Sequence, residues 1–378
     1  MWIFLFIYSI ILLLINFKID KYLRCGIVSR LIFIFSSLFL IVLLLYRGSV
    51  GMDWESYKDF YSTSGNLVDL IRNGWYFELN LEPGFQIYLA LLKTLGLTVN
   101  WVPVGLLIII LITLYNECVR FKVPFLVVIA FYILTVYLHF FEQIRMAFVY
   151  SIGVILFIRV IYSNNKLSST YLIFLASSVQ YIAIAYFVII RFWNFGKKSC
   201  LAPFRDSTSL FRQKLKASVI MVSVFSIALV VGPSILSFLN LIPFFSTTDI
   251  VLFKKYNAYK EYSSNFEEDV SFRGSFIILL AGILFLFFYK GANYKEYKLN
   301  KLIIWTMVSS VITHLVFYEL PVLAHRLVGM LLLPSYMLLA SAYFMRNRNV
   351  LIFCILIFFA ILKFMTLVNV VGKYNWET

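Results

Sequence analysis

Long apolar runs, separated by short polar segments, make up most of the chain. A helix needs about 20 mostly apolar residues to cross the ~30 Å hydrocarbon core of a bilayer. Runs of that length, or close to it, lie at 1–17, 31–46, 101–116, 123–141, 143–162, 217–240, 275–290, 302–319, 327–345 and 350–371. The pattern therefore predicts about ten transmembrane helices.

Two further apolar segments, 84–97 and 169–190, are ambiguous. The first is short and contains Lys93, and the second is interrupted by Ser178 and Gln180. Each segment either crosses the membrane or re-enters it from one side. A membrane tolerates re-entrant backbone only where protein or a wet cavity surrounds it.

The composition agrees with a membrane protein. Hydrophobic residues make up 62% of the 378 residues and charged residues 13%, whereas soluble domains contain about 45–50% apolar and about 25% charged residues. A water-soluble globule is therefore excluded. We expect an all-α, polytopic integral membrane protein of about 10–12 transmembrane helices, forming a single transmembrane domain over residues 1–378.

The basic excess, 33 Lys and Arg against 18 Asp and Glu, indicates topology before it indicates a ligand. Lys and Arg gather in the cytoplasmic loops of membrane proteins. Basic side chains cluster in the loops 18–30 and 191–216, which we therefore expect in the cytoplasm. Two moderate loops, 47–83 and 241–274, then lie on the periplasmic side. No nucleic-acid partner is predicted.

The loop charges leave the side of one polar junction open. If both ambiguous segments cross fully, the end that carries Gln143 and Arg145 faces the cytoplasm. If neither makes a net crossing, that end faces outward. The turns at 117–122 and 163–168 carry too little charge to decide between these topologies.

Two carboxylates stand out in the first outer loop. Asp53 and Glu82 could act as a general base and its helper, or they could be solvated loop acids or helix caps. Trp54, Tyr57 and Tyr61 crowd the same loop. Aromatic faces suit the apolar faces of sugar rings, and they equally suit anchoring at lipid headgroups.

Arg145 is a candidate anion ligand at a helix end. It follows Glu142 and Gln143 between two apolar runs, so we expect it to be paired or to face a wet cavity. It either forms an i,i+3 pair with Glu142 or is held for a phosphate or pyrophosphate. The planar donor fork of a guanidinium suits the second role.

A second basic set lies late in the chain at Arg273, His325 and Arg326. His325 and Arg326 stand at the outer mouth of a helix, where the arginine either serves a site or anchors the helix by snorkelling to headgroups. The histidines show no metal-ligand spacing, and the four cysteines form no CxxC motif. Neither a metal nor another cofactor is predicted.

Three motifs occur in order in the first half of the chain: Arg47-x-x-x-Gly51-x-Asp53-x-x-x-Tyr57, Glu82-Pro83-Gly84-Phe85 and Ile144-Arg145-x-Ala147. Together they resemble the EpsG-like branch of bacterial polysaccharide polymerases, which includes many Wzy-type O-antigen polymerases. The resemblance is clearest over 45–190. It implies a multi-pass glycosyltransferase of the bacterial inner membrane that joins undecaprenyl-pyrophosphate-linked repeat units on the outer side. An outward-facing Arg145 agrees with that activity.

Two positions depart from the family pattern. In the family a Gln usually follows the motif arginine, and a His lies near the outer turn of the next helix pair. This chain has Met146 and Gln180 at those positions. If that His is catalytic in relatives, its role is vacant here or passes to His325.

The resemblance also implies a reaction. An acceptor hydroxyl would attack the anomeric carbon of the donor chain while undecaprenyl pyrophosphate leaves, and fixed cations would stabilise the departing group. The candidate catalytic residues are Asp53, Glu82 and His325. The candidate pyrophosphate or sugar ligands are Arg47, Tyr57, Gln143, Arg145, Arg273 and Arg326. The implied partners are undecaprenyl-pyrophosphate-linked glycans and membrane lipid, with a chain-length regulator as a further candidate.

Two other classes of protein stay open as alternatives. A flippase or transporter of the same lipid-linked glycan commonly shows paired structural repeats, and no internal repeat is visible here. A membrane acyltransferase that modifies the glycan is expected to have a histidine near an early helix. The first histidine of this chain is His139.

Overall fold

The computed structural model describes mainly the first half of the chain. The chain divides into two compact units, Met1–Phe187 with Tyr336–Thr378, and Val188–Ser335. The described residues are 2–18, 26–47, 51, 53–73, 81–162, 166–187, 190, 306, 309–310, 312–313, 323–324, 326–334, 358, 361, 364–365 and 368. The predicted loops 191–216 and 241–274, with Arg273 and His325, lie outside them.

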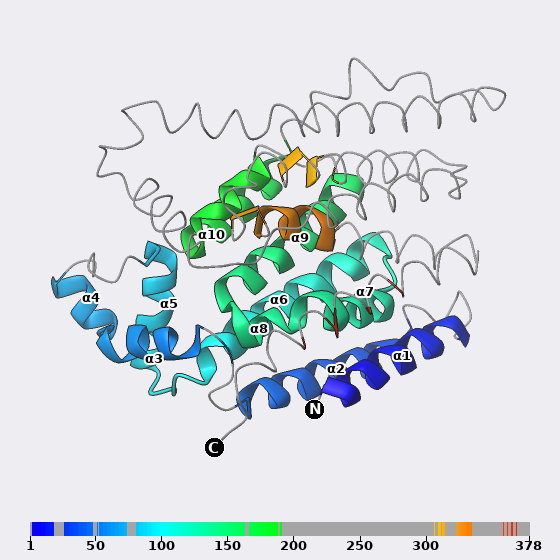
Figure 1. Cartoon of the computed structure of the whole chain (residues 1–378), viewed down its shortest axis with the longest axis horizontal. Coiled ribbons are helices and arrows are strands. Elements are labelled where there is room, and N and C mark those ends of the chain that lie inside the picture. The colour runs from blue at the N-terminus through cyan, green and yellow to red at the C-terminus, as the bar shows by residue number, and fades with distance from the viewer. Residues whose placement is uncertain are drawn as a thin grey trace, which may run out of the picture. The chain divides into compact units, whose positions relative to one another are not determined.

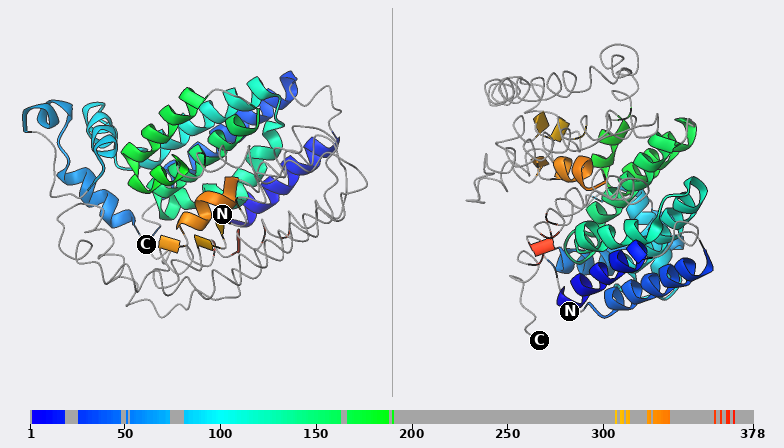
Figure 2. Two further views of the ribbon diagram at one scale, coloured as in Figure 1. Left: turned by 90° about the horizontal axis from the view of Figure 1, so that it is seen from above. Right: turned by 90° about the vertical axis from the view of Figure 1, so that its right-hand side faces the viewer.

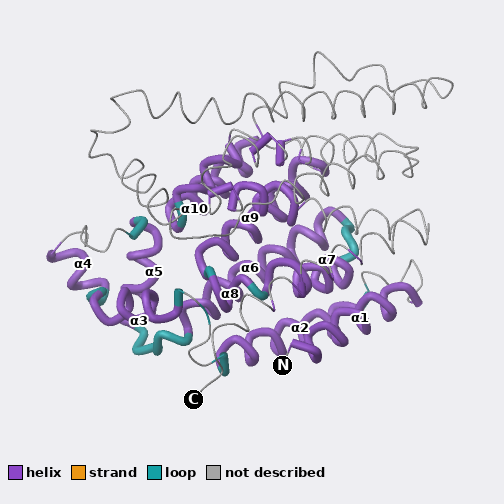
Figure 3. Tube along the Cα trace, in the orientation of Figure 1, coloured by secondary structure: helices purple, strands orange, loops and turns teal. Residues whose placement is uncertain are grey.

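The described elements are helices, with no strand among them (Figure 3). Four are long and apolar enough to cross a membrane: α2 (Ile27–Leu45), α6 (Trp101–Phe121), the continuous run Phe125–Glu142, and α9 (Ile144–Tyr162). Each falls on a run that the sequence predicted to span. The all-α, polytopic membrane fold is therefore confirmed.

The run Phe125–Glu142 forms the centre of the first unit. It consists of α7 (Phe125–Tyr132), a π-helical turn η2 (Ile133–Tyr137) and α8 (His139–Glu142), and it is buried throughout. α1 (Trp2–Lys18) and α2 lie side by side along it (Figures 1 and 2). Most of the unit's core therefore surrounds one apolar run.

Two tyrosines tie this central run to its neighbours. The Tyr137 hydroxyl donates to the Leu40 carbonyl of α2 at 2.7 Å. The Tyr132 hydroxyl shares a hydrogen bond with the Ser151 hydroxyl of α9 at 2.9 Å. A buried hydroxyl without a partner is destabilising, so these bonds favour one rotational setting of each helix.

α6 and α9 run in the same direction. Near their C-terminal ends, Glu117 and Arg159 form an ion pair of 2.5 Å, and the rings of Phe121 and Tyr162 stack 6.0 Å apart. Their N-terminal ends therefore lie at one end of the unit. We call this end of the unit the Arg145 end. Arg47, which follows α2, also lies there.

The segment 84–97 stays at the Arg145 end. α5 (Pro83–Thr94) begins there, and the Tyr88 hydroxyl of this helix donates to the first carbonyls of α6, those of Trp101 and Val102, at 3.1 and 2.7 Å. Twelve helical residues extend about 18 Å, which is too short to cross a bilayer and return. The segment makes no net crossing.

The described part of 169–190 also returns. α10 (Lys166–Val179) runs back along α9 until Ser178 meets Gly84 at the start of α5. After Gln180 comes the short 3-10 helix η3 (Tyr181–Ile184), and the Tyr186 ring then packs 6.2 Å from Phe157, far down α9. The chain therefore reverses at Gln180. This is the topology in which neither ambiguous segment crosses.

Candidate functional site

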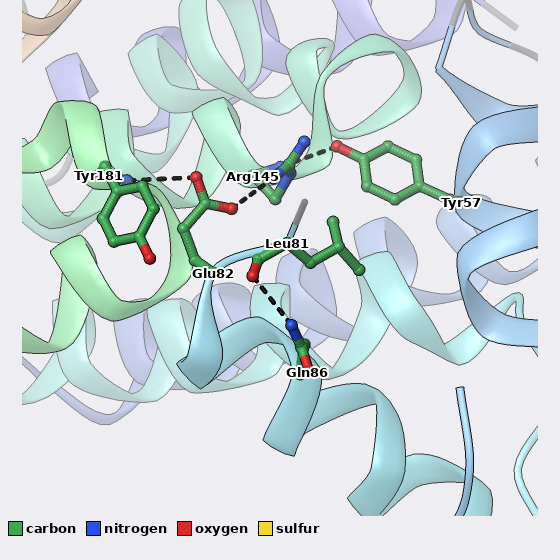
Figure 4. Close-up of polar contacts among 6 residues, drawn as sticks. All are labelled: Tyr57, Leu81, Glu82, Gln86, Arg145 and Tyr181. Carbon is green, nitrogen blue, oxygen red and sulfur yellow. Dashed lines mark hydrogen bonds and ion pairs between the residues drawn. The ribbon is translucent and has the colours of Figure 1, made fainter. Parts of the chain in front are cut away.

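An ion pair between Glu82 and Arg145 forms the centre of the candidate site (Figure 4). Glu82 precedes Pro83, whose fixed φ makes it a favoured first residue of a helix, and its side chain is 0% exposed. Arg145 is the second residue of α9, and its side chain is 20% exposed. The 2.5 Å contact between Oε2 and Nη1 joins the start of α5 to the start of α9.

Two tyrosines flank the ion pair on opposite sides (Figure 4). The backbone N–H of Tyr181 donates to Oε1 of Glu82, and the backbone N–H of Arg145 donates to the Tyr57 hydroxyl, both at 3.4 Å. The Arg145 guanidinium lies 5.6 Å from the centre of the Phe85 ring. Both oxygens of the Glu82 carboxylate are therefore engaged by the protein.

Arg47 caps the C-terminal end of α8. It is 1% exposed, its Nη1 donates to the Phe140 carbonyl at 2.5 Å, and its guanidinium stacks 4.3 Å from the Trp54 ring. The last carbonyls of a helix lack partners within it and carry partial negative charge. Burial lowers the pKa of Arg47 to about 10, so the group stays charged at neutral pH.

The backbone conformation and close packing of Gly51 explain why the first motif contains a glycine. Its φ is +115°, a conformation that favours glycine, and a Cβ at this position would overlap the Phe141 carbonyl oxygen. Gly51 therefore packs directly against the end of α8. Here the helical run breaks at Gln143 (φ −128°, ψ 75°) before α9 begins.

Asp53 lies beside Arg47 and Tyr57. It precedes α3 (Trp54–Thr63), and its carbonyl accepts the backbone N–H of Tyr57 at 3.0 Å. Its negative charge acts on both neighbouring side chains. Burial raises the pKa of the Tyr57 hydroxyl, and the charge of Arg145 opposes that shift. Asp53 is half-buried, whereas Glu82 is buried, so the Asp53 side chain is the more accessible of the two.

The fold brings most of the predicted site residues to the Arg145 end. Arg326 begins the described helical stretch 326–334 of the other unit and is half-buried. Arg273 and His325 lie outside the described part of the chain. Those that meet at the Arg145 end are Arg47, Asp53, Tyr57, Glu82, Gln143 and Arg145.

The i,i+3 pair between Arg145 and Glu142 is not formed. Glu142 faces His139 instead, with 3.8 Å between the carboxylate and Nδ1. The chain breaks at Gln143, so residues 142 and 145 do not share a continuous helix face. The partner of Arg145 is Glu82, 63 positions away.

Sequence reasoning missed the role of Lys93. Its Nζ binds the carbonyls at the C-terminal end of α3: those of Tyr61 and Ser62, at 3.1 and 2.9 Å, and that of Ser64. A cation at a helix C-terminus is stabilising. Lys93 thus ties α3, which presents Tyr57, to α5, which directly follows Glu82. A charge inside a short apolar segment was the available signal.

Among the described residues, no group of three or more His, Cys, Asp or Glu side chains is arranged to hold a metal ion. The model of the EpsG family matches residues 30–376.

The chain belongs to the EpsG family. This confirms the resemblance drawn from the three motifs, and it extends the match beyond 45–190. Membership supports a role like that of a membrane glycosyl polymerase, in general terms. Comparison with curated proteins and with solved structures finds no match.

Proposed function

We propose that this EpsG family member is a polysaccharide polymerase of the bacterial inner membrane. It joins undecaprenyl-pyrophosphate-linked oligosaccharide repeat units into O-antigen or a similar surface polysaccharide, and it does so on the periplasmic side. The observation that carries the proposal is the Glu82–Arg145 pair at the Arg145 end, with Arg47 beside it. Two fixed guanidinium groups at one helix junction suit a diphosphate.

The proposed chemistry is glycosyl transfer. A hydroxyl of the acceptor chain attacks the anomeric carbon of the donor, the bond from that carbon to the pyrophosphate oxygen breaks, and the electron pair leaves with undecaprenyl pyrophosphate. Charge therefore develops on the departing oxygen, where fixed cations act most strongly. Arg145 stands at the N-terminus of α9, whose helix dipole adds partial positive charge.

Glu82 serves this reaction best as a positioning residue. One carboxylate oxygen contacts Arg145 and the other accepts the Tyr181 N–H, so neither is placed to take a proton from a substrate. Asp53 is the better candidate for the general base because it is half-buried and lies beside Tyr57 and Arg47. A base must come within hydrogen-bond reach of the hydroxyl.

The test is deletion of the gene, followed by gel analysis of the surface polysaccharide. Loss of a polymerase leaves a single repeat unit on the lipid core, and the plasmid-borne wild-type gene restores the ladder. A flippase deletion would leave no repeat unit. An acyltransferase deletion would leave a full ladder that lacks acyl groups. Either of these patterns would contradict the proposal.

A further inference from the structure

Gln180 carries a buried polar group that the proposed reaction has not used. The residue is 6% exposed and has extended backbone (φ −152°, ψ 113°) between α10 and η3. Its N–H donates to Ala176 and its carbonyl accepts from Ala183, at 2.9 and 3.0 Å. No described residue donates a hydrogen bond to its side-chain oxygen, Oε1.

Contacts on both sides of Gln180 hold it at the start of α5. On one side, a Cβ on Gly84 would overlap the Ser178 hydroxyl and lie 2.7 Å from the Ser178 carbonyl oxygen, so the two backbones touch closely. On the other side, Tyr181 donates its N–H to Glu82. Gln180 is therefore fixed next to the Glu82–Arg145 pair.

A buried acceptor without a donor destabilises the protein that holds it. Such a group is expected where a ligand supplies the missing bond. Oligosaccharides carry a hydroxyl donor on most ring carbons, whereas a pyrophosphate offers acceptors and suits the arginines. Gln180 Oε1 therefore matches the sugar portion of a lipid-linked glycan.

We propose that Gln180 is a sugar-binding residue whose amide oxygen accepts a hydrogen bond from a hydroxyl of the repeat unit. The inference rests on the proposed function. The assignment also gives the substrate a direction in the site, because Tyr181 and Tyr57 lie on opposite sides of the Glu82–Arg145 pair (Figure 4). The sugar lies on the Tyr181 side, and the pyrophosphate lies on the Tyr57 side, where Arg47 is.

The first test replaces Gln180 with Met in the deletion strain and measures polymer at matched protein level. Gln180→Met keeps the length of the side chain and removes the unpaired oxygen, so the amount of folded protein should hold or rise. Loss of one neutral hydrogen bond to the sugar should slow polymerisation by on the order of tenfold. Wild-type polymerisation in this variant would overturn the proposal.

Gln86→Met is the matched control. Gln86 is 4% exposed and its Nε2 donates to the Leu81 carbonyl at 3.0 Å, next to Glu82. Its loss removes an internal hydrogen bond, so the protein level should fall while polymerisation per molecule stays near wild type. If both variants lowered only the protein level, Gln180 would be a structural residue and the proposal would be wrong.

A second readout separates the sugar contact from the pyrophosphate contact. Undecaprenyl pyrophosphate added to membranes should inhibit Gln180→Met and wild type at the same concentration, because this probe has no sugar. A shifted inhibition would place Gln180 at the pyrophosphate and contradict the assignment. If gene deletion left the polymer at full length, the proposed function would fail as a whole, which differs from failure of the Gln180 variant alone.

Discussion

Arg145 and Glu82 are each unfavourable in this environment without the other. Breaking a buried ion pair by removing one partner typically costs about 3–5 kcal/mol, because the remaining charge is buried without compensation. Substitutions at these two positions therefore change both the amount of folded protein and the chemistry. An informative experiment separates the two effects with matched controls.

Arg145→Ala should abolish polymerisation while protein remains in the membrane, because the fixed cation beside the departing pyrophosphate is lost. Arg145→Lys should rescue poorly, since an ammonium keeps the charge without the bidentate fork. Polymer length on gels, at matched protein level, is the measurement. Arg159→Ala is the control: it breaks the other ion pair of α9, with Glu117, and should leave polymerisation per molecule intact. Equal losses in both variants would reject the pyrophosphate role.

Asp53→Asn should leave mostly single-repeat glycan at normal protein level, because general-base catalysis typically contributes about 10²–10⁴-fold. The exposed neighbour Glu55, which pairs with Lys58 at 3.6 Å, provides the control variant Glu55→Gln. Full-length polymer from Asp53→Asn would refute the base assignment.

Glu82→Gln should reduce both folded protein and polymer, because Arg145 loses its partner.

The charged site residues could be identified as candidates from the sequence, but which of them form ion pairs could not be predicted. Asp53 and Glu82 stood out as two carboxylates in one outer loop, and Arg145 stood out because an ionised side chain between apolar runs is costly. The contact between Glu82 and Arg145 depends on how three intervening segments fold back, and no local pattern records that. Glu142 was the nearer partner in sequence, and a break of one residue at Gln143 removed it.

At the scale of elements, the site depends on how closely the loop after α2 approaches the end of α8. Arg47 and Gly51 make that approach, through the Phe140 and Phe141 carbonyls. The spanning helices were predicted because their apolar length is a direct signal. The short helices α3 and α4 (Leu67–Asn73) were not predicted, because they lie inside a polar loop. The π-helical turn had no sequence signal.

Gly51→Ala should destabilise the unit and lower polymerisation, because the new Cβ overlaps the Phe141 carbonyl and the backbone is strained by about 1–3 kcal/mol. Gly96 is the control: its φ is +66°, and a Cβ there would meet nothing within 4 Å. Gly96→Ala should therefore show only the backbone cost. Melting temperatures of the two variants in detergent give the comparison, and equal shifts would show that the close approach is unimportant.

For the whole molecule, we predict which end faces the periplasm by combining the fold with the loop charges. The fold puts the loop after α2 and the Arg145 junction at one end of the unit, which loop charges alone left open. The basic loop 191–216 predicts which side that end faces. The structure thus shows that 84–97 and the described part of 169–190 make no net crossing, and the basic residues of 191–216 indicate the cytoplasmic side.

Single-cysteine labelling tests the topology, in a background that lacks the four native cysteines. An impermeant maleimide should label Gly65→Cys, between α3 and α4, and should spare Ser207→Cys in the basic loop. Lys122→Cys should also be spared, because Lys122 ends α6 at the opposite end of the unit. Labelling of Lys122→Cys with protection of Gly65→Cys would invert the orientation and move the site to the cytoplasm.

The separation of Glu82 from Arg145 also sets an order of events during synthesis. After Glu82 the ribosome adds 63 more residues to reach Arg145, which takes roughly 3–13 s at 5–20 residues per second. Throughout that interval the Glu82 carboxylate lacks its partner Arg145, so it must stay hydrated and the start of α5 cannot form this contact. The Arg145 end therefore forms only after α9 has entered the bilayer, and a chain truncated before that helix should remain an easy substrate for membrane proteases.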